Sequence, residues 1–253
     1  MESKASWFRL GVCLLALTLA FIGAQILDWA PNVSAQVTGS SVAALVPAPS
    51  ALSVPLGGPI PIDVWGFVIT EPGVYQLATN LSGTSGVAVT VNASNAEILG
   101  NGKTIRGDGN FTESTNKETG ISIGSHSNVI INGVRFAQLD TAISVANTSP
   151  VQDNSVFNVG VDTTAIGINW TNQSSAQNIS FRYTTFNYVR NYGIYWTNKD
   201  SNDRSGGVGV TNSRFTNTGK SGGAYGYAVY FSNTGVAQNT AITSDTLATR
   251  RTL

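Results

Sequence analysis

Residues able to do chemistry are sparse in this chain and form no familiar catalytic set. The sequence has one histidine, His126 in "GSHSN", and one cysteine, Cys13. It contains no Asp-Asp pair and no "GHG". Glycoside hydrolysis needs two placed carboxyl groups, so we predict no catalytic residues and interpret His126 as a solvated turn residue. The acidic stretch "DSNDRSGG" fails the oxygen spacing of a calcium loop, and we predict no metal and no cofactor.

One short phrase recurs along the chain. "GINWTNQ" (167–173) returns as "GIYWTNK" (193–199), and looser copies begin at residues 86, 120, 142 and 228. The second and fourth positions of each copy are apolar, as in Ile168 and Trp170. This period of two indicates a short strand with one buried face. The third position of each copy should therefore face outward.

The outward third position carries no carboxylate and no base. From the first copy to the last it reads Ala88, Ser122, Ser144, Asn169, Tyr195 and Tyr230. Asn169, Tyr195 and Tyr230 would form a stack able to contact a sugar or a partner protein. The alternative is that the tyrosines merely cover the strands.

The sixth position is asparagine in four successive copies: Asn147, Asn172, Asn198 and Asn233. Coils stacked at roughly 4.8 Å would let these amides hydrogen-bond in a ladder along the axis. We therefore predict a structural asparagine ladder.

Four charged residues follow the recurring phenylalanines at similar spacing: Asp140, Asp162, Arg190 and Lys220. If they stack along one edge, they form either an acid/base or cation site, or a surface charge ladder that contributes little. The surface ladder is the favoured interpretation.

The intervals between the phrases indicate a repeat architecture. A second strand pattern, apolar-any-apolar with a phenylalanine five residues on, accompanies three copies, and the shortest interval is 22 residues. Units this short, without helical stretches, suit coils of a parallel β-helix with inserted loops. A leucine-rich horseshoe or a propeller would need other patterns or longer units.

The N-terminal part suggests export. Residues 1–35 read as a signal peptide, with an apolar run at 10–27 and a cleavage site after Ala35; an uncleaved membrane anchor is the alternative. Residues 36–62 are a linker rich in Pro, Ser and Ala, 63–246 the repeat domain, and 247–253 a tail without a capping helix. Zero net charge argues against a nucleic-acid partner. Sequons mark glycosylation candidates at Asn80, Asn92, Asn110 and Asn178.

Two further motifs resemble a known family. "PGVYQL" (72–77) and "GNGKTIRG" (100–107) are similar to the opening coils of exported right-handed parallel β-helix proteins of the pectin-lyase-like fold, particularly surface proteins of methanogenic archaea. The resemblance covers Val68 to Thr246 and implies a single-stranded right-handed β-helix. It is specific for the fold and says little about function.

We therefore expect an extracytoplasmic cell-surface protein with a structural, adhesive or assembly role, and lean against an enzyme. Its partners would be surface polysaccharides or proteins, or further copies of itself through the coil ends. A protein that binds or cleaves polysaccharides is the alternative, and a periplasmic accessory factor is a weaker one.

Overall fold

The described part of the chain consists of strands. The structure, a computed structural model, describes residues 58–111, 117–198 and 204–218, and also 220–221, 224–225, 227–233, 236–238, 241–243 and 246–248. These all lie in the compact unit Val46–Leu253. The expected signal segment lies outside the described residues. Within them there is no helix, and hence none long and apolar enough to span a membrane.

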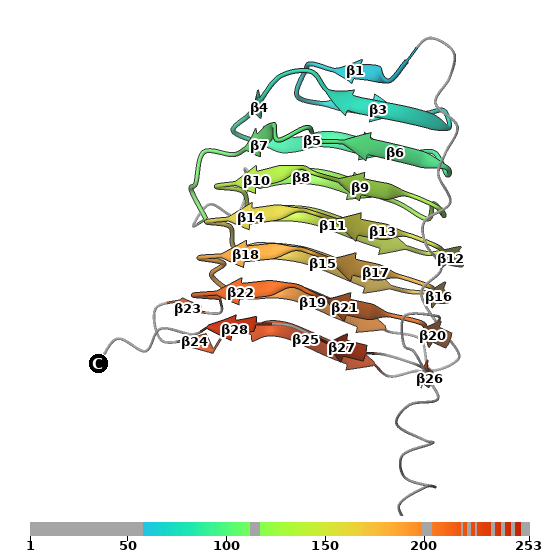
Figure 1. The fold of residues 1–253 in the computed structure, drawn as a ribbon, viewed down its shortest axis with the longest axis vertical. Coiled ribbons are helices and arrows are strands. Elements are labelled where there is room, and N and C mark those ends of the chain that lie inside the picture. The colour runs from blue at the N-terminus through green and yellow to red at the C-terminus, as the bar shows by residue number, and fades with distance from the viewer. Residues whose placement is uncertain are drawn as a thin grey trace, which may run out of the picture. The chain divides into compact units, whose positions relative to one another are not determined.

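Three long parallel sheets and one short parallel sheet build the unit (Figure 1). Sheet A contains β1 (Ile60–Ile62), β3 (Gly73–Leu77), β6 (Ala96–Leu99), β9 (Ile130–Asn132), β13 (Ser155–Phe157), β17 (Ser180–Arg182), β21 (Gly209–Thr211) and β27 (Ala241–Thr243). Sheet B contains β2 (Phe67–Ile69), β5 (Gly86–Val91), β8 (Glu118–Ile123), β11 (Thr141–Asn147), β15 (Ile166–Asn172), β19 (Tyr192–Asn198) and β25 (Tyr227–Asn233).

Sheet C contains β4 (Leu81–Ser82), β7 (Thr104–Arg106), β10 (Arg135–Ala137), β14 (Gly160–Asp162), β18 (Thr185–Asn187), β22 (Arg214–Thr216) and β28 (Thr246–Ala248). Sheet D contains β12 (Val151–Gln152), β16 (Ala176–Gln177), β20 (Arg204–Gly206) and β26 (Val236–Gln238). The strands β23 (Lys220–Ser221) and β24 (Ala224–Tyr225) form an antiparallel pair.

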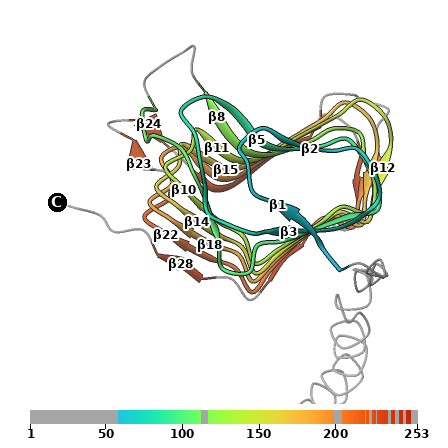
Figure 2. The same cartoon turned by 90° about the horizontal axis from the view of Figure 1, so that it is seen from above.

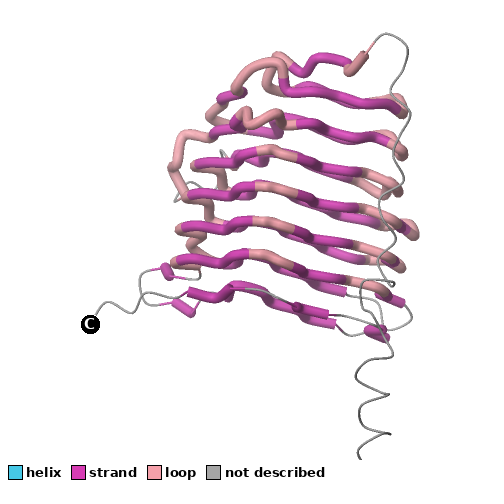
Figure 3. Tube along the Cα trace, in the orientation of Figure 1, coloured by secondary structure: helices cyan, strands magenta, loops and turns pink. Residues whose placement is uncertain are grey.

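The chain passes through the sheets in a fixed order. In one coil β11 leads to β12, β13 and β14, and β15 then lies beside β11 in the next coil. Seen along the stack, the sheets enclose a lumen filled by the core (Figure 2), and strand and turn alternate at the same places in successive coils (Figure 3). The expected all-β chain of stacked parallel strands is confirmed, and the arrangement is compatible with a parallel β-helix.

Five sheet B strands, β5, β8, β11, β15 and β19, bury two residues in succession rather than one. In β15 Ile166 is half-buried, Gly167 and Ile168 are buried, and Asn169 is half-buried again. A Cβ on Gly167 would lie 2.4 Å from the Gly193 carbonyl oxygen and 2.6 Å from the Phe186 ring. Glycine is needed here because a sheet C ring packs directly onto its Cα.

The first residue of each phrase is smaller where the sheet C side chain that faces it is larger. Glycine occurs in the three coils whose sheet C strand supplies Phe136, Phe186 or Phe215, and a Cβ on Gly120, Gly167 or Gly193 would meet that ring. Alanine occurs where sheet C supplies a smaller side chain in the same register: Ala88 with Ile105, and Ala142 with Val161. The opening Gly or Ala of the phrase therefore compensates for the volume opposite.

The corners between the sheets use left-handed backbone at matching positions. One column of positive φ values follows sheet C and comprises Gln138, Thr163, Tyr188 and Asn217. Asparagine adopts this conformation readily, whereas a β-branched residue is strained in it. Thr163, with a φ of 51°, is the β-branched member of this column.

Thr163→Asn is therefore expected to stabilise the protein by about 0.5–1 kcal/mol, since αL backbone costs a β-branched residue about 1–2 kcal/mol and the exposed Thr163–Asp162 hydrogen bond is weak. The urea midpoint of the purified protein measures the effect. Thr185→Asn, at an exposed position in strand β18, is the matched control and should be neutral or destabilising. Equal effects of the two substitutions would contradict the strain argument.

Several boundaries and registers differ from expectation. Strand β1 begins at Ile60, inside the expected linker 36–62, and β28 extends to Ala248, inside the expected tail 247–253. Register partners are 22 residues apart between β8 and β11, as expected, and 25 residues apart in the middle coils, as the expected inserted loops allow. Phe157 lies on sheet A, and Val161 takes the place in register with Phe136 and Phe186.

Candidate functional site

The outward face of sheet B ends in four packed tyrosines. Backbone register places Asn169, Tyr195 and Tyr230 opposite one another on β15, β19 and β25, as the sequence predicted. The rings of Tyr195 and Tyr230 stack at 5.2 Å with an interplanar angle of 5°. The structure therefore brings all three predicted residues into one column.

A second column of tyrosines lies directly beside the first. Tyr192 and Tyr227 are paired in register, and their rings stack at 5.9 Å and 6°. Tyr192 also contacts Tyr195 at 4.7 Å, and Tyr227 contacts Tyr230 at 5.4 Å. We call these four residues the tyrosine cluster.

The second column was not predicted from the sequence, because strict alternation of inward and outward side chains places Tyr192 and Tyr227 in the core. In β15 and β19 the first two residues of the phrase are both buried, and the residue just before the phrase is only half-buried. The sequence does show a tyrosine just before the opening Gly193 and Ala228, and this repetition could have indicated the second column.

The geometry of the tyrosine cluster limits what it can bind. Two pairs of rings use faces against each other, and Tyr227 is 46% exposed. The ring faces within each stacked pair are therefore covered and cannot contact a ligand. Such an apolar surface with polar tips is typical of protein interfaces, whereas packing against a sugar needs an open ring face.

The first copy of the phrase was aligned two residues too early. Val89 and Thr90 pair with Ile121 and Ser122, so Thr90 occupies the outward third position. Ala88 is fully buried and belongs to the small-residue column. The outward column still carries no carboxylate and no base.

The four predicted ladder asparagines lie in register on β11, β15, β19 and β25. Asn147 and Asn172 are fully buried, and Asn147 Nδ2 donates to Asn172 Oδ1. Asn198 is also buried, and the side chain of Asn233 lies outside the described residues. Each copy of the phrase therefore stacks on the copy before it.

The corner before sheet A carries further stacked polar side chains that the sequence analysis did not find. Asn128 Nδ2 donates to Asn95 Oδ1 at 2.9 Å, and Asn178 Nδ2 donates to Asp153 Oδ1 at 3.0 Å. All four residues have positive φ. Asparagine and aspartate therefore serve two purposes here, the backbone turn and the contact between coils.

The predicted charge ladder is not assembled. Asp140 is buried before β11, whereas Asp162 is exposed on β14 and accepts from Asn187 Nδ2 at 3.1 Å. The Arg190 guanidinium lies 5.2 Å from the centre of the Phe111 ring, and the side chain of Lys220 lies outside the described residues. Asp162 lies outside the predicted column because its spacing was counted from Phe157, which lies on sheet A.

The other predicted positions are spread over the coils. His126 lies in a turn, and its backbone oxygen accepts from Asn154 Nδ2. Among the glycosylation candidates Asn80 and Asn92 are exposed and Asn110 is half-buried. Asn178 has its amide engaged with Asp153. In the described part of the chain no group of three His, Cys, Asp or Glu residues could hold a metal ion.

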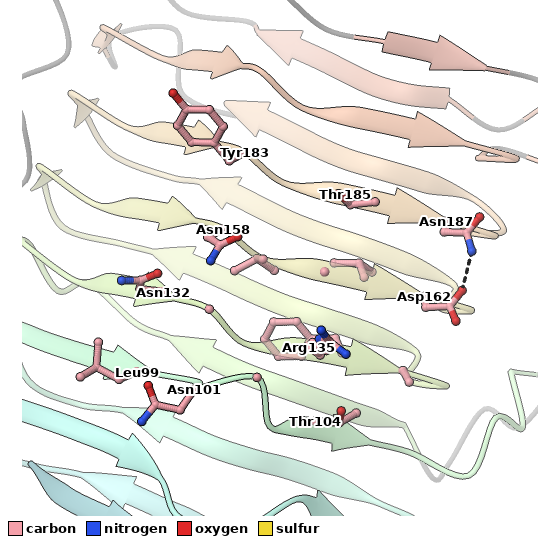
Figure 4. Close-up of a pocket in the computed structure, with 17 residues that line it drawn as sticks. Leu99, Asn101, Thr104, Asn132, Arg135, Asn158, Asp162, Tyr183, Thr185 and Asn187 are labelled. Atoms are coloured by element: carbon pink, nitrogen blue, oxygen red, sulfur yellow. Dashed lines mark hydrogen bonds between the residues drawn. The ribbon is translucent and has the colours of Figure 1, made fainter.

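A polar groove runs over the corner between sheets A and C (Figure 4). Its volume is about 710 Å³, and it crosses successive coils. Tyr183 lines it with a φ of 51° and 53% exposure, and its ring contacts Phe157 edge-on at 5.5 Å. The remaining labelled lining residues are Leu99, Asn101, Thr104, Asn132, Arg135, Asn158, Asp162, Thr185 and Asn187.

In comparisons with known proteins no family model, no curated protein and no solved structure matched this chain.

Proposed function

We propose that this chain is an exported right-handed parallel β-helix protein of the pectin-lyase-like kind, related to surface proteins of methanogenic archaea, and that it acts in adhesion or surface assembly without enzymatic activity. The apolar run at 10–27, the sequons and the opening motifs support export and kinship. The tyrosine cluster supports a contact role.

The partner that best fits the tyrosine cluster is another cell-surface protein. Tyrosine supplies large contact area at low entropic cost, and its hydroxyl can hydrogen-bond at the margin of an interface. The four rings pack against one another. Their side chains therefore lose little conformational entropy when a partner binds. Asn169 adds an amide at the edge of the same column.

Binding of the full chain to isolated cell-surface material tests this role. Tyr227→Ser/Tyr230→Ser should weaken binding at least tenfold, because aromatic anchors in interface centres contribute about 2 kcal/mol or more. Tyr188→Ser removes a more exposed tyrosine, 56% accessible, outside the cluster and should leave binding unchanged. Equal affinity of the cluster variant and the parent would refute the proposal.

The second candidate function is polysaccharide binding, and the corner groove is the feature that supports it. Its amides, Arg135 and Asp162 are groups that hydrogen-bond to sugar hydroxyls. Treating the surface material separates the two candidates: protease should abolish binding to a protein partner, whereas periodate should abolish binding to a glycan. Periodate-sensitive binding that is lost in Tyr183→Ser and kept in the cluster variant would establish the groove instead.

A further inference from the structure

A fully buried carboxyl group begins strand β8. Glu118 is 1% exposed, and its backbone N–H donates to Asp140 Oδ2 at 3.0 Å. Its partner in register on β5 is Gly86, which offers no side chain. A buried glutamate that makes no ion pair is costly and calls for a chemical explanation.

Three carboxyl groups meet at this point. The Asp140 carboxyl lies beside Glu118, because its Oδ2 accepts the Glu118 backbone N–H, and the Asp108 carboxyl is near enough to act on the Glu118 pKa. Asp140 already accepts the Glu118 amide, and Asp108 Oδ1 accepts the Asn110 amide at 2.7 Å. Neither oxygen of Glu118 has a donor among the described residues.

A shared proton resolves this contact. Two carboxylates present only acceptors to each other, so their approach becomes a hydrogen bond when one of them carries a proton. Burial, together with the neighbouring Asp140 and Asp108, raises the pKa of Glu118 to about 7. Glu118 is thus the member of the group that holds the proton.

The charged groups nearby leave this assignment intact. Lys117 is exposed beside Glu118, Arg106 of β7 donates through Nε to Gln138 Oε1 at 2.6 Å, and Arg190 lies over Phe111. None of these cations hydrogen-bonds to the Glu118 carboxyl. Within the described residues the carboxyl group also lacks the arrangement of a metal site.

We propose that Glu118 is a proton-operated latch: its protonated carboxyl bridges Asp140, at the start of β11, and Asp108, after β7, and its ionisation loosens these coils. The folded protein binds this proton more tightly than the unfolded chain, whose glutamate has the ordinary pKa of 4.5. The stabilisation is therefore complete below pH 4.5 and is lost as the pH rises through about 7.

Thermal unfolding of the full chain at pH 5.5 and pH 8.5 tests the latch. The midpoint should fall by a few °C more in the parent than in Glu118→Gln, because the amide is neutral at both pH values and can donate to the aspartates. Glu71→Gln removes an exposed carboxyl group and should keep the parental pH dependence. An unchanged pH dependence in Glu118→Gln would overturn the proposal.

Two further measurements keep the proposal open to refutation if Glu118→Gln fails to fold. In the parent, the infrared carbonyl band of isotope-labelled protonated glutamate should disappear between pH 5.5 and pH 8.5, and its absence at pH 5.5 would refute the latch. Calcium should leave the midpoint of the parent at pH 8.5 unchanged. A calcium-dependent rise in the midpoint of the parent at pH 8.5 would show that a cation, not a proton, neutralises the group, and it would overturn the latch.

Discussion

Gly167→Ala is expected to destabilise the protein by about 2–3 kcal/mol, because the new methyl group overpacks a filled site. It would lie 2.6 Å from the Phe186 ring and 2.4 Å from the Gly193 carbonyl. Phe186→Val alone should cost a similar amount by leaving a cavity. The double variant recreates the natural pair Ala142 and Val161, and it should cost about 1–2 kcal/mol less than the sum of the single changes.

Urea unfolding followed by circular dichroism measures the three variants against the parent, with the midpoint as readout because coils can unfold separately. The control combines Gly167→Ala with Val161→Ala, which lies in the neighbouring coil and should give no rescue. Additive effects of Gly167→Ala and Phe186→Val would show that ring size does not determine where glycine is needed.

Trp196→Ala should have the largest effect of any single change, about 3–5 kcal/mol, because it removes a fully buried indole from the lumen. Trp196 stacks on Trp170 at 4.9 Å and lies 6.2 Å from the Phe231 ring. The cavity would open between two coils and remove support from both. Hydrogen exchange should show faster exchange in β15 and β19 than in β3 and β6.

Trp65→Ala provides the matched comparison near the other end of the stack. Trp65 is half-buried, and its Nε1 donates to the Ser85 carbonyl at 2.9 Å. Its loss should cost less and leave exchange in β15 unchanged. If both substitutions cost the same, the stacked indoles would not be the central support of these coils.

Period-two patterns predicted the strands of sheet B well because burial there follows local residue type. Ile168, Trp170, Ile194 and Trp196 are buried as expected. The pattern could not show the second buried position in each strand, since glycine at that position carries no hydrophobic signal. For the same reason the Tyr192 column was missed, whereas Ala88 was assigned to the outward face because the first copy was aligned two residues too early.

Tertiary proximity was harder to predict than local structure. The Glu118 group depends on Asp108, which reaches it from the segment after β7, and on Asp140, 22 residues further along the chain. No local pattern marks these residues as neighbours. Conversely, Asp162 and Arg190 have similar spacing from a phenylalanine but do not lie in one column. Asp162 was counted from Phe157, which lies on sheet A, and Arg190 from Phe186, which lies on sheet C.

The direction of the hydrogen bonds between coils has a mechanical consequence. Strands lie across the stack and pair with the coils on either side, so a pull along the stack loads these bonds end-on and separates coils one after another. Each coil of 25 residues would release about 80 Å of chain at roughly 3.3 Å per residue. A protein built in this way would yield in small steps under tension and absorb energy at each step, while its remaining coils keep their contacts.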